Sequence, residues 1–298
     1  MHVSILTFCV PELNDADRVR ETLFHVEQSD LSFPNLYLLR HKYGTEIAFY
    51  KNWLFRRYTG NGRLKGYTFP VGANIDEEEA LFHVEHHART HGTPLHFCLL
   101  TEEQAHFLKE KYGDQISFSH DQGDADYLYR REDLVELPGT SFHKKRNQIS
   151  RFERHFGEWR FRELDEKNVA DALQIARDWV NYQDPSANHE HELRAIEKAL
   201  VLRRDLGIFG GLLYVEQKPA ALSLASFINS SVADIHYEKC VPDYRDAYAL
   251  IVREMARRTN CNLINREEDL NVPGLRRAKL SYNPVRILQK YSAVVDLC

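Results

Sequence analysis

The stretch Asn262-Leu-Ile-Asn-Arg-Glu-Glu-Asp-Leu-Asn-Val-Pro-Gly-Leu-Arg-Arg-Ala-Lys-Leu-Ser-Tyr282 joins a short apolar segment, a charged loop and a basic helix. The apolar pair Leu263-Ile264 predicts a strand that stops at Asn265. Pro273 favours the first turn of a helix because its fixed φ suits that position. Since open α/β sheets bind ligands beyond the carboxyl ends of their strands, this order predicts a functional site. A solvated loop with surface ion pairs is the alternative.

The polar residues of this stretch supply most of the predicted site. Arg276 and Lys279 stand three residues apart, so they share one face of the helix. Two cations on one face suit a phosphate, a carboxylate or a developing oxyanion. The preceding loop adds candidates for orienting the ligand: Asn265, Arg266, Glu267 and Asp269.

A second candidate group lies at the end of the strand predicted for residues 232–239. Side chains alternate along a strand, so His236 and Glu238 are expected on the same face. A histidine and a carboxylate at a strand end suit a general base and the group that orients it. An edge strand with solvated polar ends explains the same pattern.

The second half of the chain alternates helices and strands. Tight turns join three strands over residues 208–216, 219–229 and 232–239, which predicts an antiparallel meander. We expect further strands at 159–164, 263–265 and 285–295, and helices at 166–182, 190–206, 243–259 and 273–281. This mixture favours an α+β domain in which helices back a sheet.

The first half has the same mixed character. We expect strands at residues 35–39, 46–58, 65–70, 94–100, 116–119 and 127–129, and helices at 15–28, 76–91 and 101–113. Leu137-Pro-Gly-Thr140 interrupts the pattern, so the predicted domains are 1–138 and 139–298. A basic helix then follows over 141–156, and it contributes four candidate ligand-binding residues: His143, Lys144, Arg146 and Asn147.

Composition narrows the functional class. A net charge of −5 argues against nucleic-acid binding by the whole surface, although a local basic patch is compatible with it. The five cysteines are scattered without a Cys-x-x-Cys pair, which suits a reducing cytoplasm. The N-terminus has no basic leader, and no apolar run approaches the roughly 20 residues of a membrane span. We therefore expect a cytoplasmic protein.

Several common chemistries lack their motifs. The sequence has no Gly-x-Ser-x-Gly elbow, no P-loop and no Gly-x-Gly-x-x-Gly turn. His83, His87 and His91 fall on one helix face, but no further ligand is evident from the sequence, so no metal site is predicted. Cys240 and Cys261 are expected to be buried bystanders rather than nucleophiles.

Several motifs in the same order resemble one family. They are Leu137-Pro-Gly-Thr-Ser-Phe-His-Lys-Lys-Arg-Asn147, His236-Tyr-Glu-Lys239, Ile264-Asn-Arg-Glu-Glu-Asp-Leu270 and Gly274-Leu-Arg-Arg-Ala-Lys-Leu-Ser-Tyr282, together with Tyr67-Thr-Phe-Pro-Val-Gly72 and Asp126-Tyr-Leu-Tyr129. The chain is similar over nearly its whole length to the soluble relatives of the C-terminal domain of lysylphosphatidylglycerol synthases, the DUF2156 group.

The resemblance implies two tandem acetyltransferase-like (GNAT) folds, similar also to the Fem transferases of peptidoglycan synthesis. In the lipid synthases this domain passes an aminoacyl group from aminoacyl-tRNA to a lipid hydroxyl. The membrane-spanning part of the synthases is absent from this sequence. The turn that holds pyrophosphate in acyl-CoA enzymes reads Asp243-Tyr-Arg-Asp-Ala-Tyr-Ala249 here, without glycine, and this disfavours acetyl-CoA as the donor.

Together these features predict an acyltransferase that moves an aminoacyl or acyl group to an amine or hydroxyl of a small molecule, peptide or lipid head group. Lys279 and Arg276 would stabilise the oxyanion or hold the donor, Glu238 or His236 would act as base, and Tyr282 as acid. The donor is aminoacyl-tRNA or acyl-CoA. Two alternatives remain: an acetyl-CoA-dependent N-acetyltransferase, and a non-catalytic module that binds tRNA or another anion.

Overall fold

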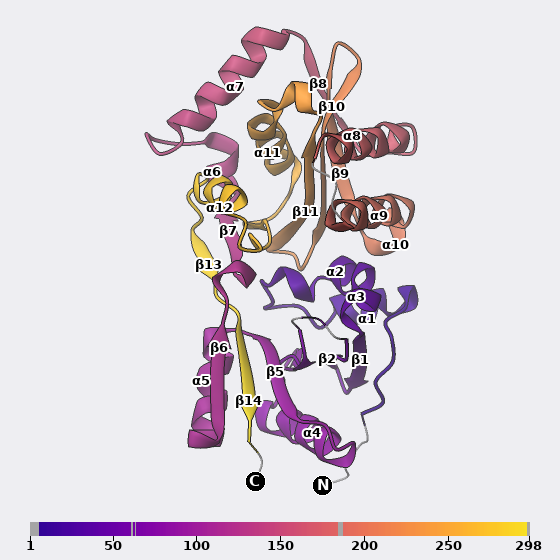
Figure 1. Cartoon of the computed structure of the whole chain (residues 1–298), viewed down its shortest axis with the longest axis vertical. Helices are drawn as coiled ribbons and strands as arrows, with labels where there is room; N and C mark the ends of the chain where they lie inside the picture. The colour runs from indigo at the N-terminus through magenta and orange to yellow at the C-terminus, as the bar shows by residue number, and fades with distance from the viewer. Residues whose placement is uncertain (1–5, 61, 63, 184–186, 297–298) are drawn as a thin grey trace. The chain divides into compact units, whose positions relative to one another are not determined.

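The protein forms two compact units in the computed structural model, which describes residues 6–60, 62, 64–183 and 187–296 (Figure 1). The first unit comprises Met1–Asp126, Glu268–Val272 and Ile287–Cys298, and the second comprises Tyr127–Glu267 and Pro273–Arg286. This division differs from the predicted boundary after residue 138. The physical reason is strand pairing, because residues 127–130 join the sheet of the second unit and the C-terminal strand joins that of the first.

The first unit is built on a mixed sheet in the order β1-β2-β3-β5-β14-β6, with β4 paired to β2. Its strands are β1 Thr45–Tyr50, β2 Trp53–Tyr58, β3 Gly66–Tyr67, β4 Val71–Gly72, β5 Leu95–Leu100, β6 Ile116–His120 and β14 Tyr291–Val295. Its α-helices are α1 Ala16–Arg20, α2 Phe33–Leu38, α3 Arg40–Tyr43, α4 Glu77–Thr90 and α5 Glu102–Tyr112. The apolar face of α4 packs into the core beside Phe55 and Phe97.

The first unit corrects three predictions of secondary structure. Residues 35–39 were expected to be a strand, but residues 35–38 lie in α2 and Leu39 is its C-cap, because Ser32 is extended and Pro34 stands at the start of the helix. The helix expected over 15–28 ends at Arg20. The long strand expected over 46–58 is the hairpin of β1 and β2, which turns at Lys51 in the left-handed conformation.

The second unit holds most of the other mixed sheet, whose strands follow the order β13-β7-β12-β11-β10-β9-β8. Its strands are β7 Asp126–Arg130, β8 Trp159–Glu163, β9 Phe209–Val215, β10 Lys218–Phe227, β11 Val232–Cys240, β12 Leu263–Asn265 and β13 Arg286–Leu288. The predicted meander of β9, β10 and β11 is confirmed, and all its pairs are antiparallel. The single strand expected over 285–295 is instead two strands, β13 and β14, that belong to different sheets.

Helices cover both faces of the second sheet (Figure 1). α8 Val169–Tyr182 and α9 Ala187–Val201 lie on one face, and α11 Ala247–Arg258 lies on the other. The remaining helices are α6 Arg131–Glu136, α7 His143–Phe156, α10 Arg203–Leu206 and α12 Pro273–Leu280. β9, β10 and β11 are buried along most of their length, as expected for strands covered on both faces. The α+β class is thus confirmed.

Candidate functional site

The candidate site forms where β11 and β12 stop pairing. The two strands run parallel only over Val232–Asp234 and Leu263–Asn265, while β11 continues to Cys240. The chain leaving β12 turns at Arg266 and Glu267, and Glu267 adopts the left-handed conformation with φ of 57°. Side chains from this turn therefore reach the second half of β11.

An ion pair joins this turn to β11. Arg266 donates hydrogen bonds from Nε, at 3.1 Å, and from Nη2 to one carboxylate oxygen of Glu238. Both side chains are nearly buried, with 11% and 12% exposure. Burial opposes the charged guanidinium, but Glu238 outweighs it and raises the pKa of Arg266. Among the described residues, Nη1 of Arg266 is buried and has no hydrogen-bond partner.

Aromatic rings and a second cation complete this group. The Arg266 guanidinium lies 4.6 Å from the ring centre of Tyr282, which is buried just after α12. Nζ of Lys145, on α7, lies 3.8 Å from the centre of the same ring. Burial, and then the charge of Arg266, lower the pKa of Lys145 to about 8. We call Glu238, Arg266, Tyr282 and Lys145 the Arg266 cluster.

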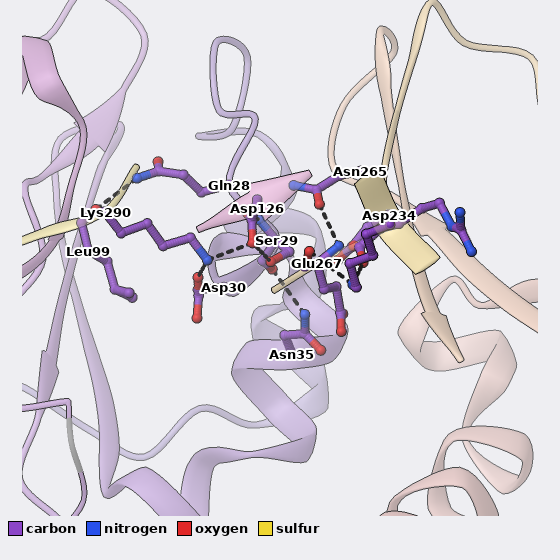
Figure 2. A network of polar contacts seen from close by, with 12 residues as sticks. Gln28, Ser29, Asp30, Asn35, Leu99, Asp126, Asp234, Asn265, Glu267 and Lys290 are labelled. Carbon is purple, nitrogen blue, oxygen red and sulfur yellow. Dashed lines mark hydrogen bonds and ion pairs between the residues drawn. The ribbon is translucent and has the colours of Figure 1, made fainter. Parts of the chain in front are cut away.

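His236 belongs to a neighbouring group on β11. It lies at a register shift between β10 and β11. Its two neighbours, Ile235 and Tyr237, pair with the consecutive residues Ala225 and Leu224, so His236 has no partner in the pairing register. Its Nε2 lies 2.9 Å from Oγ of Ser226. Its Nδ1 lies 3.2 Å from a carboxylate oxygen of Glu267 and 3.4 Å from one of Asp234. We call Asp234, His236 and Glu267 the His236 cluster; Figure 2 labels its two carboxylates.

Lys279 is buried, but its contacts differ from those expected of an oxyanion-binding group. Its Nζ donates to the backbone carbonyl of Arg266 and, at 3.1 Å, to that of Glu267. Its own carbonyl accepts a hydrogen bond of 2.9 Å from the hydroxyl of Tyr129. Lys279 therefore fixes the turn that carries Arg266, and contact with a substrate would require it to release these carbonyls.

The other predicted residues of the loop have separate positions. Oδ1 of Asn265 accepts a 2.7 Å hydrogen bond from the backbone of Glu267, which shapes the turn (Figure 2). Asp269 belongs to the first unit, where it accepts a hydrogen bond from the backbone of Asn271. Arg276 is half-buried on α12. The structure thus brings Asn265, Arg266 and Glu267 together with Glu238 and His236.

The predicted residues of the basic helix lie mainly on its outer side. His143, Lys144 and Asn147 of α7 are exposed, and the side chains of His143 and Asn147 contact each other. Arg146 donates to the carbonyls of Leu137 and Gly139, so it holds the turn before the helix. Lys145 is the residue of this helix that joins the Arg266 cluster, and it is not among the predicted site residues.

The histidines of α4 form no metal-binding group within the described residues, where the arrangement with ligand spacing is the His236 cluster. His87 accepts or donates a 2.8 Å hydrogen bond with the hydroxyl of Tyr67. Burial raises the pKa of the Cys240 and Cys261 thiols. Cys240 is buried as expected, whereas Cys261 is half-buried. Cys298 lies outside the described residues.

Comparison with known proteins now identifies the family. The profile described as "Phosphatidylglycerol lysyltransferase, C-terminal" matches residues 21–294. The chain belongs to this family. An uncharacterised protein of Mycoplasmoides gallisepticum is 26% identical over 202 residues, and the alignment covers 64% of this chain and 62% of that relative. The predicted family is thereby confirmed.

Solved structures support the same fold. A conserved protein of unknown function from Bacteroides thetaiotaomicron has 32% identity and a TM-score of 0.91, with 98% of this chain and 100% of that chain covered. The C-terminal domain of a putative lysylphosphatidylglycerol synthetase from Agrobacterium fabrum has 16% identity and a TM-score of 0.65, with 95% and 92% covered. FemX has 9% identity and a TM-score of 0.59, with 97% of each chain covered. The chain therefore has the same fold as these three proteins.

Within residues 6–60, 62, 64–183 and 187–296, no helix combines the length and the apolar character that a membrane crossing requires.

Proposed function

We propose that this family member is a transferase that moves an aminoacyl group from an activated ester to an amine or hydroxyl acceptor at the Arg266 cluster. One observation carries the proposal. The cluster places two cationic side chains, Arg266 and Lys145, against one carboxylate, and Nη1 of Arg266 is buried without an acceptor among the described residues. Buried donors of this kind stabilise negative charge that develops in a transition state.

The proposed chemistry is acyl transfer. The acceptor nitrogen or oxygen attacks the ester carbonyl, and Arg266 receives the developing oxyanion. Neutral Lys145 takes the proton of the acceptor, and its ammonium group returns that proton to the leaving oxygen as the ester bond breaks. A pKa of about 8 suits this exchange near neutral pH. Glu238 positions Arg266, and Lys279 holds the turn.

The start of α11 favours an aminoacyl ester over acyl-CoA as donor. Asp243 and Asp246 both precede the first residue of this helix, and the carboxylate of Asp246 pairs with Arg151 of α7. A pyrophosphate is attracted to a helix N-terminus by its free N–H groups and positive end. Carboxylates at the same place repel it, and no glycine allows close approach of the backbone.

The test uses the full chain with two radiolabelled donors, total aminoacyl-tRNA and acetyl-CoA, and a low-molecular-mass cell extract as the source of acceptors. We expect label to leave aminoacyl-tRNA. Lys145→Met should slow this transfer by about 100-fold or more, the loss typical of one missing oxyanion or proton-transfer group. The matched control is Lys144→Met, because Lys144 is the exposed neighbour on the same helix.

The outcomes separate the rival functions. Transfer from acetyl-CoA, together with a rise in melting temperature at millimolar acetyl-CoA, would replace this proposal by an N-acetyltransferase. Salt-sensitive tRNA binding without turnover, weakened by Lys144→Glu, would indicate a binding module. Equal transfer rates for Lys145→Met and Lys144→Met would remove the Arg266 cluster from the mechanism.

A further inference from the structure

We propose that the His236 cluster is a binding site for a zinc-like divalent cation, with Nδ1 of His236 and one carboxylate oxygen each of Asp234 and Glu267 as ligands. One such atom from each residue lies within 4.8 Å of the other two. Imidazole and carboxylate are both ordinary zinc ligands. The inference concerns a different set of side chains from the Arg266 cluster and does not depend on the transferase proposal.

The distances in the cluster suit ligands around a small ion. Nδ1 of His236 lies at hydrogen-bond distance, 3.2 Å, from Glu267 and at 3.4 Å from Asp234. A tetrahedron with metal–ligand bonds of about 2.05 Å has edges of about 3.3 Å. The distances from Nδ1 of His236 to Glu267 and to Asp234 therefore match the ligand–ligand distances of such a tetrahedron. A cation would also draw the two carboxylates together by cancelling their repulsion.

The ligands are held by their surroundings before any ion binds. Asp234 and His236 lie on β11 with side-chain exposures of 0% and 1%. Glu267 is directed back to β11 by its left-handed backbone, by Asn265 and by the bond from Lys279 to its carbonyl. The remaining ring nitrogen of His236 contacts Ser226. Such an outer hydrogen bond fixes the orientation of a metal-binding imidazole.

The ligand set also selects among cations. Mg²⁺ and Ca²⁺ prefer all-oxygen sites with six or more ligands, whereas one imidazole with two carboxylates suits Zn²⁺ or a related transition metal. The Glu267 side chain keeps 24% exposure, so the site is reached from solvent on that side. Three protein ligands plus one solvent-facing position is the arrangement of zinc sites that bind a water or a substrate.

The competing account is that His236 lies between the two carboxylates as a polar contact only, without a metal. Both accounts place negative charge around the imidazole, but they differ in what Zn²⁺ does. In the proposed site, one Zn²⁺ per chain binds and raises the melting temperature, because the ion binds the native state. In the competing account, Zn²⁺ has no specific place and leaves unfolding unchanged.

The experiment measures Zn²⁺, Co²⁺ and Mg²⁺ binding to the tag-free, chelator-treated full chain by calorimetry, with the melting temperature as second readout. We expect one tightly bound Zn²⁺ per chain and weak Mg²⁺ binding. Bound Co²⁺ should show the visible absorption bands of a four-coordinate site. Glu267→Gln and His236→Gln should abolish the tight site. Ser226→Ala should weaken it by about 10- to 100-fold, because it removes the outer hydrogen bond.

The matched controls exclude other ligands. His91→Gln removes an exposed histidine of the α4 group, and Glu192→Gln removes a carboxylate that pairs with Lys239 of the same strand β11. Both should bind Zn²⁺ as the wild type does. If His236→Gln does not fold, Glu267→Gln and Ser226→Ala still decide the question. Zn²⁺ affinity that is equal in the wild type, Glu267→Gln and Ser226→Ala would overturn the proposal.

Discussion

Lys290 in the first unit and Lys145 in the second are both withdrawn from water, yet their surroundings are opposite. Lys290 bonds to Asp30 and, at 2.7 Å, to Asp126, whose carboxylate also accepts from the backbone and hydroxyl of Ser29 (Figure 2). Burial opposes its charge, but Asp126 and Asp30 outweigh this and raise its pKa. For Lys145, burial and then the charge of the nearby Arg266 lower the pKa to about 8.

This difference separates a structural charge from a functional one. A buried cation paired with two carboxylates is needed for stability, because removing one partner leaves an uncompensated buried charge. A cation beside another cation costs stability, and proteins retain such strain mainly at functional sites. We therefore propose that the group of Ser29, Asp30, Asp126 and Lys290 serves stability and that the Arg266 cluster serves function.

The largest expected effect on stability follows from removing Lys290. Lys290→Met should destabilise the first unit by about 3–5 kcal/mol, the usual cost of breaking a buried ion pair on one side. Urea unfolding, with hydrogen exchange of the β14 amides as a local readout, measures it. Lys109→Met, at an exposed position of the same unit, is the control. A decrease in the free energy of unfolding of less than about 1 kcal/mol, as for a surface ion pair, would contradict the structural role assigned to Lys290.

Removing Lys145 should have the opposite sign. At pH 7 Lys145 is charged in the native state, although burial and the charge of Arg266 disfavour the charged form. Lys145→Met should therefore raise the melting temperature. Between pH 8 and the ordinary value of 10.5 the unfolded chain binds more protons at this lysine than the native chain does. Wild-type stability therefore rises with pH relative to the variant, and the advantage of Lys145→Met should disappear by about pH 10.5. A melting temperature lowered by the substitution at pH 7 would refute the assignment.

A smaller effect is expected at His87, a buried base of the first unit. Burial, and then the charge of Arg57, lower its pKa from 6.5 to about 4. Below pH 6.5 the unfolded chain binds the additional proton, so the stability of the native state falls as the pH drops towards 4. His87→Gln should reduce this acid sensitivity in thermal melts at pH 4 to 7. Identical pH profiles of stability for the wild type and His87→Gln would show that His87 does not cause the acid sensitivity.

The sequence predicts much of the second unit because its patterns are strong. The meander, the basic helix and the strand at 263–265 agree with the structure to within a few residues. The first unit is predicted less well where local signals compete. The run Asn35–Leu39 is apolar enough for a strand, but Ser32 and Pro34 carry the helix-start signal that decides it.

Two site features depend on tertiary structure. Lys145 precedes Ile149 and Phe152 by four and seven residues, so it lies on the apolar face of α7. That position was a usable signal, because a lysine among core residues is unusual. The role of Lys279 offered no such signal, since its hydrogen bonds to the carbonyls of Arg266 and Glu267 follow from the turn that β12 makes.

The break in the segment 285–295 has a similar origin. Lys290 interrupts an otherwise strand-like run, and the chain passes from β13 to β14 at this point. A single lysine in such a run is normally placed on a solvated face. Its burial against Asp30 and Asp126 depends on residues about 160 to 260 positions earlier in the chain, which local patterns do not reveal.

The central claim is that the Arg266 cluster carries out acyl transfer, and the initial rate of label transfer from aminoacyl-tRNA tests it most directly. The wild type is compared with Lys145→Met, with Lys144→Met, and with the charge-neutral pair Arg266→Gln plus Glu238→Gln. We predict that Lys144→Met keeps the wild-type rate, while the other two variants remain folded and lose about 100-fold or more. Wild-type rates in all three variants would contradict the account.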